Sequence, residues 1–143
     1  MMKSLVLESL KSSRLAKLAT NLYMQSPTDS LNLLTNVDKF LRSKFDYQDE
    51  KIETLQYPDY MLTGLEMSGR LVGDCDDIST LHAAILTALG FRVRFIAIRS
   101  FRENSNFDHV YLEVNLNDKW IMYDITLPLG TTVEYFGRIA IQV

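Results

Sequence analysis

The organising segment of this chain reads Leu71-Val-Gly-Asp-Cys-Asp-Asp-Ile-Ser-Thr-Leu-His-Ala-Ala-Ile-Leu-Thr-Ala-Leu-Gly90. Gly73 permits a tight turn, and Asp74 is a good N-cap residue for a helix that begins at Cys75. The apolar residues that follow recur at three- and four-residue spacing, which is typical of one buried helix face: Ile78, Leu81, Ile85 and Leu89. Gly90 stands where a helix commonly ends. The segment therefore predicts a buried helix with the only cysteine at its start.

The position of Cys75 has two interpretations. Unpaired backbone N–H groups and the helix dipole favour a thiolate at a helix N-terminus. Asp76 and Asp77 follow directly, however, and their negative charges act against a thiolate. Cysteine is also among the most buried residue types, where it is commonly inert. The segment alone therefore leaves open whether Cys75 is a nucleophile or a structural thiol.

Composition limits the class of protein. A chain of 143 residues with 47% hydrophobic and 23% charged residues suits one globular domain, which we expect to span residues 1–143. The net charge is −3, and the chain has no excess of basic residues that could bind a phosphate backbone, so we expect no nucleic-acid partner. We also expect no membrane partner, because no apolar run reaches the roughly 20 residues that a membrane span needs. Glu8 and Lys11 interrupt any signal-peptide core, so we expect a cytoplasmic protein. The sequence gives no indication of the oligomeric state.

The rest of the chain predicts helices first and strands afterwards. Leucines at near-helical spacing predict a helix over residues 3–24, and a second helix runs from Thr28 or Asp29 to about Phe45. Residues 46–70 are the least periodic, and their proline and glycine pairs indicate short turns that could form a lid. Alternating patterns predict strands at 91–98, 107–116, 120–125 and 133–143, the last with a bulge at Gly137. This order predicts an α+β fold, with the N-terminal helices and the central helix packed on an antiparallel β-meander.

A nucleophilic cysteine needs a base, and the sequence has two histidines. His82 lies on the same predicted helix as Cys75, about 10 Å further along its axis, which is too far for a hydrogen bond. We therefore interpret His82 as a core or helix-surface residue. His109 lies on the predicted strand 107–116, and a lone strand histidine becomes a candidate base only if a partner orients it.

Asp124 is the candidate partner of His109. If Asn117 and Asp118 form a two-residue hairpin loop, Leu116 pairs with Lys119. Asp124 then faces Tyr111, on the same side of the sheet as His109, with about 7–8 Å between the diagonal Cα atoms. A loop of odd length would place Asp124 on the opposite face.

Three blocks together resemble the transglutaminase-like superfamily of papain-type cysteine enzymes, in particular its small bacterial and phage members. The blocks are Gly73-Asp-Cys-Asp-Asp77, Asp108-His-Val-Tyr-Leu-Glu-Val114 and Lys119-Trp-Ile-Met-Tyr-Asp-Ile-Thr126. The resemblance implies a papain/transglutaminase-like core, with Cys75 as nucleophile, His109 as general base and acid, and Asp124 as the orienting carboxylate. The chain departs from the family pattern at Asp76, where many members carry an aromatic residue, and at Ile125, where the family has proline.

The resemblance also implies an upstream side chain that completes an oxyanion hole. The candidates for oxyanion or substrate binding are Gln56, Tyr57, Tyr60, Asp74 and Asp108. The backbone N–H of Cys75 is a further donor. We expect no cofactor and no metal ion. A metal site built from Asp74, Asp76, Asp77 and His109 is a weak alternative, because carboxylates on consecutive helical residues point in different directions.

Two functional hypotheses follow. The first is a cysteine enzyme that uses Cys75, His109 and Asp124 on the amide bond of a peptide or protein. Hydrolysis of a peptide or cell-wall-type amide is favoured over protein crosslinking, because the chain is small and shows no additional substrate domain or calcium loop. The second is a non-catalytic accessory or structural protein, such as a phage morphogenesis factor, that keeps the fold without the reaction.

Overall fold

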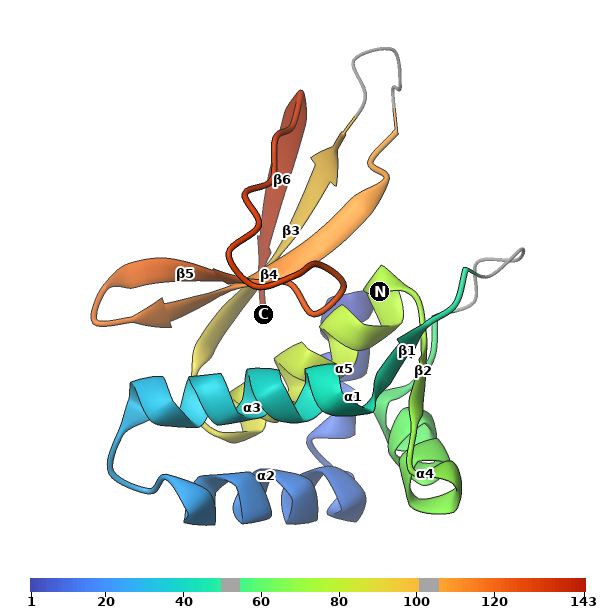
Figure 1. The fold of residues 1–143 in the computed structure, drawn as a ribbon, viewed down its shortest axis with the longest axis vertical. Helices are drawn as coiled ribbons and strands as arrows, with labels where there is room; N and C mark the ends of the chain where they lie inside the picture. Colours follow the sequence, from blue (N-terminus) through green and yellow to red (C-terminus); the bar gives the residue numbers. More distant parts are fainter. Residues whose placement is uncertain (50–54, 101–105) are drawn as a thin grey trace.

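The computed structural model describes residues 1–49, 55–100 and 106–143, which form an α+β fold (Figure 1). The helices are α1 (Met2–Ser9), α2 (Ser13–Gln25), α3 (Ser30–Lys44), α4 (Pro58–Ser68) and α5 (Cys75–Ala88). The strands are β1 (Phe45–Tyr47), β2 (Leu71–Gly73), β3 (Arg92–Arg99), β4 (His109–Leu116), β5 (Lys119–Tyr123) and β6 (Gly137–Gln142). The predicted fold class is confirmed. Among the described residues, no helix combines the length and apolarity required to cross a membrane.

Helix α5 lies at the centre of the molecule. It packs against α1, α2 and α4 and also against strands β3 and β4 (Figure 1). Its apolar face is fully buried, with Ile78 1% exposed and Leu81, Ile85 and Leu86 0% exposed. The helix begins at Cys75 as predicted, and Gly90 adopts a φ of 91° just after its end. The buried stripe of α5 therefore fixes one end of the helix, with its cysteine, beside the sheet.

The N-terminal region contains two helices where the leucine pattern predicts one over residues 3–24. Helix α1 ends at Ser9, and α2 begins after Ser12, whose hydroxyl accepts a hydrogen bond from the backbone N–H of Leu15 at 3.2 Å. Ser12 thus acts as an N-cap, which starts a new helix in a new direction. The next helix agrees with its predicted start, because Asp29 caps α3 by accepting from the backbone N–H of Asn32 at 3.1 Å.

The prediction that residues 46–70 are irregular is wrong for most of the described part. Helix α4 occupies Pro58–Ser68, with proline in its first turn, and Gly69 ends it at a φ of 75°. Pro58 and Gly69, interpreted as turn signals, are therefore the start and stop signals of a short helix, and Gly64 lies inside that helix. Strand β1 pairs in parallel with β2, so Tyr47 lies opposite Gly73. Residues 50–54 of the expected lid lie outside the described residues.

The four-stranded sheet has the order β5-β4-β3-β6 and is antiparallel throughout. Leu116 pairs with Lys119 across a two-residue turn in which Asn117 and Asp118 have φ values of 53° and 63°. This register confirms the predicted hairpin. Only β3, β4 and β5 form the predicted meander, because β6 returns to the far side of β3 and does not pair with β5 among the described residues. Strand β6 begins at Gly137, so it is shorter than predicted and Gly137 is its first residue instead of a bulge within it.

The two faces of the sheet contribute to two apolar clusters. Phe95 and Leu112 belong to the main core, where helix α5 packs on the sheet. Ile96, Ile98 and Tyr111 form a smaller cluster on the opposite face, with Met122 and Val133 against it. Because His109 pairs with Ile98, its side chain shares this second face and lies at the end of β4.

Candidate functional site

Cys75 is the first residue of α5 and is half-buried. Its position is set by a capping box: the Asp74 carboxylate accepts from the backbone N–H of Asp77 at 3.1 Å, and the Asp77 carboxylate accepts from the backbone N–H of Asp74 at 3.1 Å. The thiol lies 3.8 Å from Oδ1 of Asp76 and donates a weak hydrogen bond to it. The capping box therefore presents the sulfur at the open end of a buried helix, with its own backbone N–H in the first turn.

His109 and Asp124 meet directly. Nε2 of His109 lies 2.6 Å from Oδ2 of Asp124, whose residue is only 6% exposed. His109 is the first residue of β4, and Asp124 directly follows β5, so the hairpin register brings them together. The second carboxylate oxygen of Asp124 accepts from the backbone N–H of Thr126 at 3.0 Å and from its hydroxyl at 2.7 Å. Both oxygens of Asp124 are thus engaged, which fixes the orientation of the His109 ring.

The pKa of His109 depends on Cys75 as well as on Asp124. Burial opposes protonation of the ring, but hydrogen bonds and negative charges from Asp124 and Cys75 outweigh it and raise the pKa of His109 to about 10. Since Nε2 is occupied by Asp124, Nδ1 is the nitrogen left for the thiol. Burial also opposes ionisation of Asp124, yet hydrogen bonds from His109 and Thr126 lower its pKa. An imidazolium at neutral pH is the kind of neighbour that stabilises a thiolate.

Asp77 holds Gln56 next to the start of α5 through hydrogen bonds. Its carboxylate is fully buried and accepts from the backbone N–H of Gln56 at 2.8 Å and from the Gln56 side-chain amide at 3.0 Å. The same Gln56 amide donates to the carbonyl of Val72 at 3.0 Å. Gly73 lies against this group, because a Cβ there would stand 2.7 Å from Oδ2 of Asp77. Gln56 is therefore positioned next to the turn that precedes Cys75.

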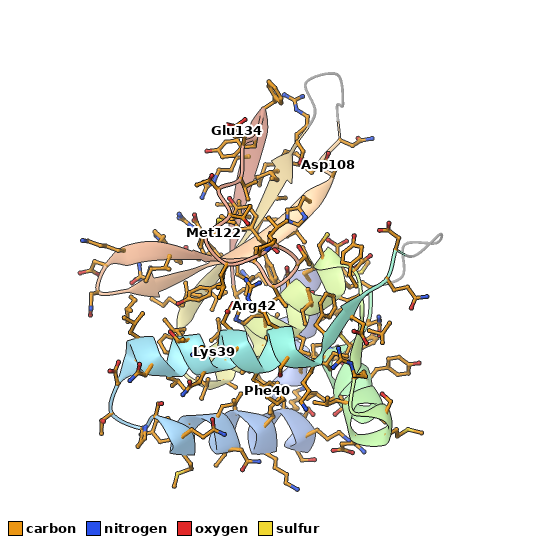
Figure 2. The ribbon with its side chains drawn as sticks, viewed as in Figure 1. Lys39, Phe40, Arg42, Asp108, Met122 and Glu134 are labelled. Atoms are coloured by element: carbon orange, nitrogen blue, oxygen red, sulfur yellow. The ribbon has the colours of Figure 1, made fainter. Side chains whose placement is uncertain are left out.

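The other predicted oxyanion and substrate candidates lie in different surroundings. Asp74 is beside Cys75, and burial is the main cause that raises its pKa to about 6. Asp108 precedes His109 and accepts from the backbone N–H of Ser100 at 2.9 Å, at the upper end of β4 in Figure 2. Tyr57 borders a hollow between α4 and the α1–α2 connection, and Tyr60 is 69% exposed on α4. Neither tyrosine makes a hydrogen bond with the three central residues in the described part of the chain.

Sequence reasoning missed two residues near the site. Tyr47 lies on β1, donates to Asp49 at 2.9 Å, and has its pKa raised mainly by burial and that hydrogen bond, with smaller contributions from the charges of Cys75 and Asp74. Arg42 on α3 donates to the backbone carbonyl of Asp124 at 2.6 Å. The alternation Phe45-Asp-Tyr47 was an available signal for a short strand. Nothing in the sequence pattern indicates the contact between Arg42 and a carbonyl 82 residues away.

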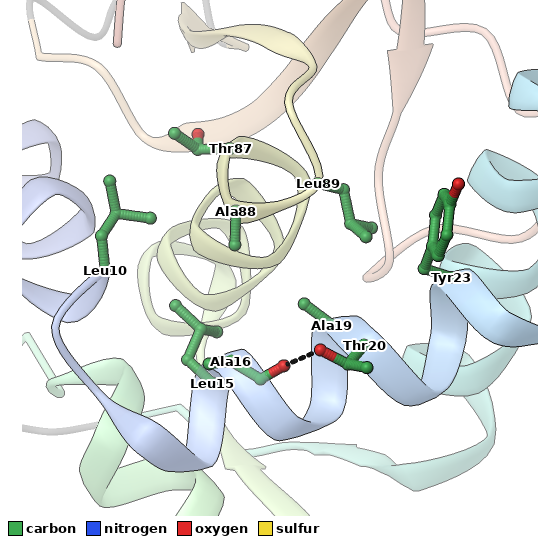
Figure 3. Close-up of a pocket in the computed structure, with 9 residues that line it drawn as sticks. All are labelled: Leu10, Leu15, Ala16, Ala19, Thr20, Tyr23, Thr87, Ala88 and Leu89. Carbon is green, nitrogen blue, oxygen red and sulfur yellow. Dashed lines mark hydrogen bonds between the residues drawn. The ribbon is translucent and has the colours of Figure 1, made fainter. Parts of the chain in front are cut away.

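The hollow at the other end of α5 lacks this chemistry. A cavity of about 540 Å³ lies between α2 and the C-terminal end of α5, at the opposite end of that helix from Cys75 (Figure 3). Its lining has no carboxylate, thiol or imidazole: Leu10, Leu15, Ala16, Ala19, Thr20, Tyr23, Thr87, Ala88 and Leu89. No group of three or more His, Cys, Asp and Glu side chains within residues 1–49, 55–100 and 106–143 could hold a metal ion.

Comparison with known families gives a match over residues 13–142 to the family described as "Transglutaminase-like domain". The chain belongs to the transglutaminase-like family. The match includes Cys75, His109 and Asp124, and it leaves residues 1–12, which contain the first helix, and Val143 outside. A search of curated proteins found no matching sequence.

Two solved structures share the fold of this transglutaminase-like chain. One, from Cytophaga hutchinsonii, is described as a "putative cysteine protease" and has a TM-score of 0.63 at 19% identity; the match covers 93% of this chain and 46% of that one. The other, from Parabacteroides distasonis, is described as a "putative protease" and has a TM-score of 0.59 at 12% identity over 82% of this chain and 24% of that one. This chain therefore spans less than half the length of either structure, and the likeness is one of fold.

Proposed function

We propose that this protein is a cysteine enzyme that acts on amide bonds through Cys75, His109 and Asp124. The observation that carries the proposal is the link between the three side chains: Asp124 accepts from His109 at 2.6 Å, and hydrogen bonding with both Asp124 and Cys75 raises the pKa of His109 to about 10. Membership in the transglutaminase-like family and the protease-like fold support this choice. On this proposal residues 1–143 act as one domain.

The proposed mechanism assigns one role to each group. The Cys75 thiolate attacks the amide carbonyl, and the backbone N–H of Cys75 donates to the oxyanion that develops. His109 then donates its proton to the leaving amine, while Asp124 holds the ring in the orientation that this transfer needs. Water or a second amine attacks the thioester, with His109 as general base. Hydrolysis of a peptide or cell-wall-type amide is the proposed outcome, and the fold shared with two structures described as putative proteases supports it.

The first test is the reactivity of the thiol. Because Cys75 is the only cysteine, thiol alkylation reports on it alone, and Cys75→Ala measures the reaction of all other groups. We expect iodoacetamide to alkylate wild type near neutral pH at least about tenfold faster than free cysteine. His109→Ala should reduce this rate toward that of free cysteine. A wild-type rate equal to that of free cysteine, with His109 intact, would contradict the proposal. Active protein would then be screened against peptide and cell-wall-type amides.

The second candidate is a non-catalytic accessory protein with the same fold. The observation that favours it is the contact between the thiol and Oδ1 of Asp76 at 3.8 Å, because a neighbouring carboxylate stabilises the protonated thiol. The two candidate functions predict different alkylation rates for wild type and for Asp76→Asn. Asp76→Asn should leave an active enzyme at least as reactive toward iodoacetamide as wild type. Under the accessory function, alkylation remains as slow as that of free cysteine in both proteins.

A further inference from the structure

Arg42 joins α3 to the segment that carries Asp124. Its Nη2 donates to the carbonyl of Asp124 at 2.6 Å, and its Nη1 donates to the carbonyl of Leu127. Its Nε donates to Oδ2 of Asp38 at 2.9 Å, one helical turn earlier on α3. All three nitrogens of the guanidinium are therefore engaged. Figure 2 shows Arg42 on the side of α3 that faces the sheet.

The segment held by Arg42 determines where the Asp124 carboxylate points. It leaves β5 at Tyr123 and turns at once, with Leu127 donating to the carbonyl of Asp124 at 3.4 Å. Thr126 fixes one carboxylate oxygen, so the other is directed at His109 only if the backbone of residue 124 stays in place. The Arg42 contacts act on that backbone and leave the carboxylate itself to Thr126 and His109. A shift of the turn would lengthen the 2.6 Å contact with His109.

Asp38 neutralises much of the charge of Arg42, so Arg42 acts on the Asp124 segment mainly through the geometry of its hydrogen bonds. The Asp38 side chain is 4% exposed and pairs with the Arg42 side chain, which is 22% exposed, so the two opposite charges offset each other close to Asp124. Arginine suits the role because its planar fork donates in several fixed directions. Lysine keeps the positive charge, but its single nitrogen cannot reproduce three divergent contacts.

We propose that Arg42, braced by Asp38, is a positioning residue that fixes the Asp124 backbone so that its carboxylate meets His109. This inference deepens the proposed cysteine site and rests on it for its functional meaning. It predicts that loss of Arg42 disturbs the His109–Asp124 contact although Arg42 touches neither the His109 ring nor the Asp124 carboxylate.

The test measures the pKa of His109 by NMR titration of its ring, in a Cys75→Ala background that cannot react. Arg42→Met is the main variant, and Arg14→Met, which removes an exposed arginine that pairs with Asp59 and Glu66, is the control. A positioning role predicts that the pKa of His109 falls by about one unit or more, because the ring loses its carboxylate partner. A purely electrostatic role predicts a rise, because removal of a nearby cation favours the imidazolium. The control should leave the pKa within about 0.2 units of its reference background.

Arg42→Lys decides the question if Arg42→Met does not fold, because it keeps the charge that balances Asp38. A lower pKa of His109 in that variant supports positioning, and an unchanged or raised value overturns it. In the Cys75-containing protein we expect the alkylation rate to fall about tenfold in the Arg42 variants and to stay unchanged in Arg14→Met. Slow alkylation of wild type itself would end the proposed enzyme function, whereas the NMR result would still decide the role of Arg42.

Discussion

Nε2 of His109 lies 2.6 Å from Oδ2 of Asp124, although 15 positions separate the two residues in the chain. The contact spans the two arms of one hairpin, and the register of that hairpin places both side chains on one face. It uses one ring nitrogen and leaves the other for Cys75. The pair is therefore the structural centre of the candidate site.

Removing the charge of Asp124 should lower the pKa of His109. Asp124→Asn keeps the shape of the side chain but replaces the carboxylate with a neutral amide. We expect the pKa of His109, raised to about 10 in the wild type, to fall by about one to three units in an NMR titration. Asp108→Asn is the matched control, because Asp108 is also close to His109 but hydrogen-bonds to Ser100. Equal shifts in the two variants would show that Asp124 has no special contact with the ring.

His82 should make the protein sensitive to mild acid. It is 1% exposed, and burial, together with the charge of Arg42, lowers its pKa to about 3 even though Asp124 acts in the opposite direction. The His82 ring takes up a proton with a pKa of about 6.5 in the unfolded chain but only near pH 3 in the folded protein. The unfolding free energy is therefore highest above about pH 6.5 and decreases as the pH falls from 6.5 toward 3. We expect this residue alone to cost about 2 kcal/mol of unfolding free energy between pH 7 and pH 5.

Replacement of His82 by phenylalanine isolates this effect. The ring of His82 meets Tyr123 edge to face, so an aromatic replacement keeps that contact. Urea unfolding at pH 7 and pH 5 should show a smaller loss of unfolding free energy for His82→Phe than for wild type. Equal losses would mean that another group governs the acid response.

Gly73 should tolerate no side chain, because of packing and not because of its backbone angle. A Cβ at Gly73 would lie 2.7 Å from Oδ2 and 2.8 Å from Cβ of Asp77, and 3.0 Å from Nε2 of Gln56. Gly73→Ala should therefore destabilise the protein by about 1–3 kcal/mol in chemical denaturation. Gly64→Ala is the control, since nothing lies within 4 Å of its Cβ position inside α4. That variant should gain about 0.5–1 kcal/mol, and similar values for both would refute the packing argument.

The β4–β5 turn should gain stability from a glycine. Asp118 adopts a φ of 63°, and Asn117 a φ of 53°, which are the angles of a hairpin turn that favours Asn-Gly. Asp118→Gly should raise the unfolding free energy by about 0.5 kcal/mol, as relief of the left-handed strain exceeds the entropic cost of glycine. Lys39→Gly on the exposed side of α3 should instead lower it by about 1 kcal/mol. A loss of stability in Asp118→Gly would argue against this turn geometry.

The sequence was informative wherever local rules determine the structure. The helix that starts at Cys75 follows from Asp74, the apolar spacing and Gly90, and the hairpin register follows from Asn117 and Asp118. Because that register alone sets which face Asp124 occupies, its contact with His109 could be anticipated. The roles of these residues in catalysis stay predictions.

The features that the sequence did not predict have physical causes of their own. Ser12 divides the N-terminal helix with a single hydroxyl, which the leucine pattern over residues 3–24 does not reveal. Pro58 and Gly69 mark the ends of α4, but the same residues also occur in irregular turns. Arg42 and Tyr47 reach the site only through tertiary packing and strand pairing, which depend on residues far away in the chain. Contacts of that kind have no periodic signature in one sequence.

The placement of β6 has a practical consequence for handling the protein. It borders the sheet, pairing only with β3 within the described residues, and its Ile139 and Ile141 are each 45% exposed. Its single charged residue, Arg138, is already engaged with Glu113. A free apolar border of this type offers backbone groups to any extended chain and so promotes aggregation. Concentrated samples should therefore aggregate through the exposed edge of β6 and become turbid during storage. Ile139→Lys places a charge on this edge and should keep samples of the same concentration clear.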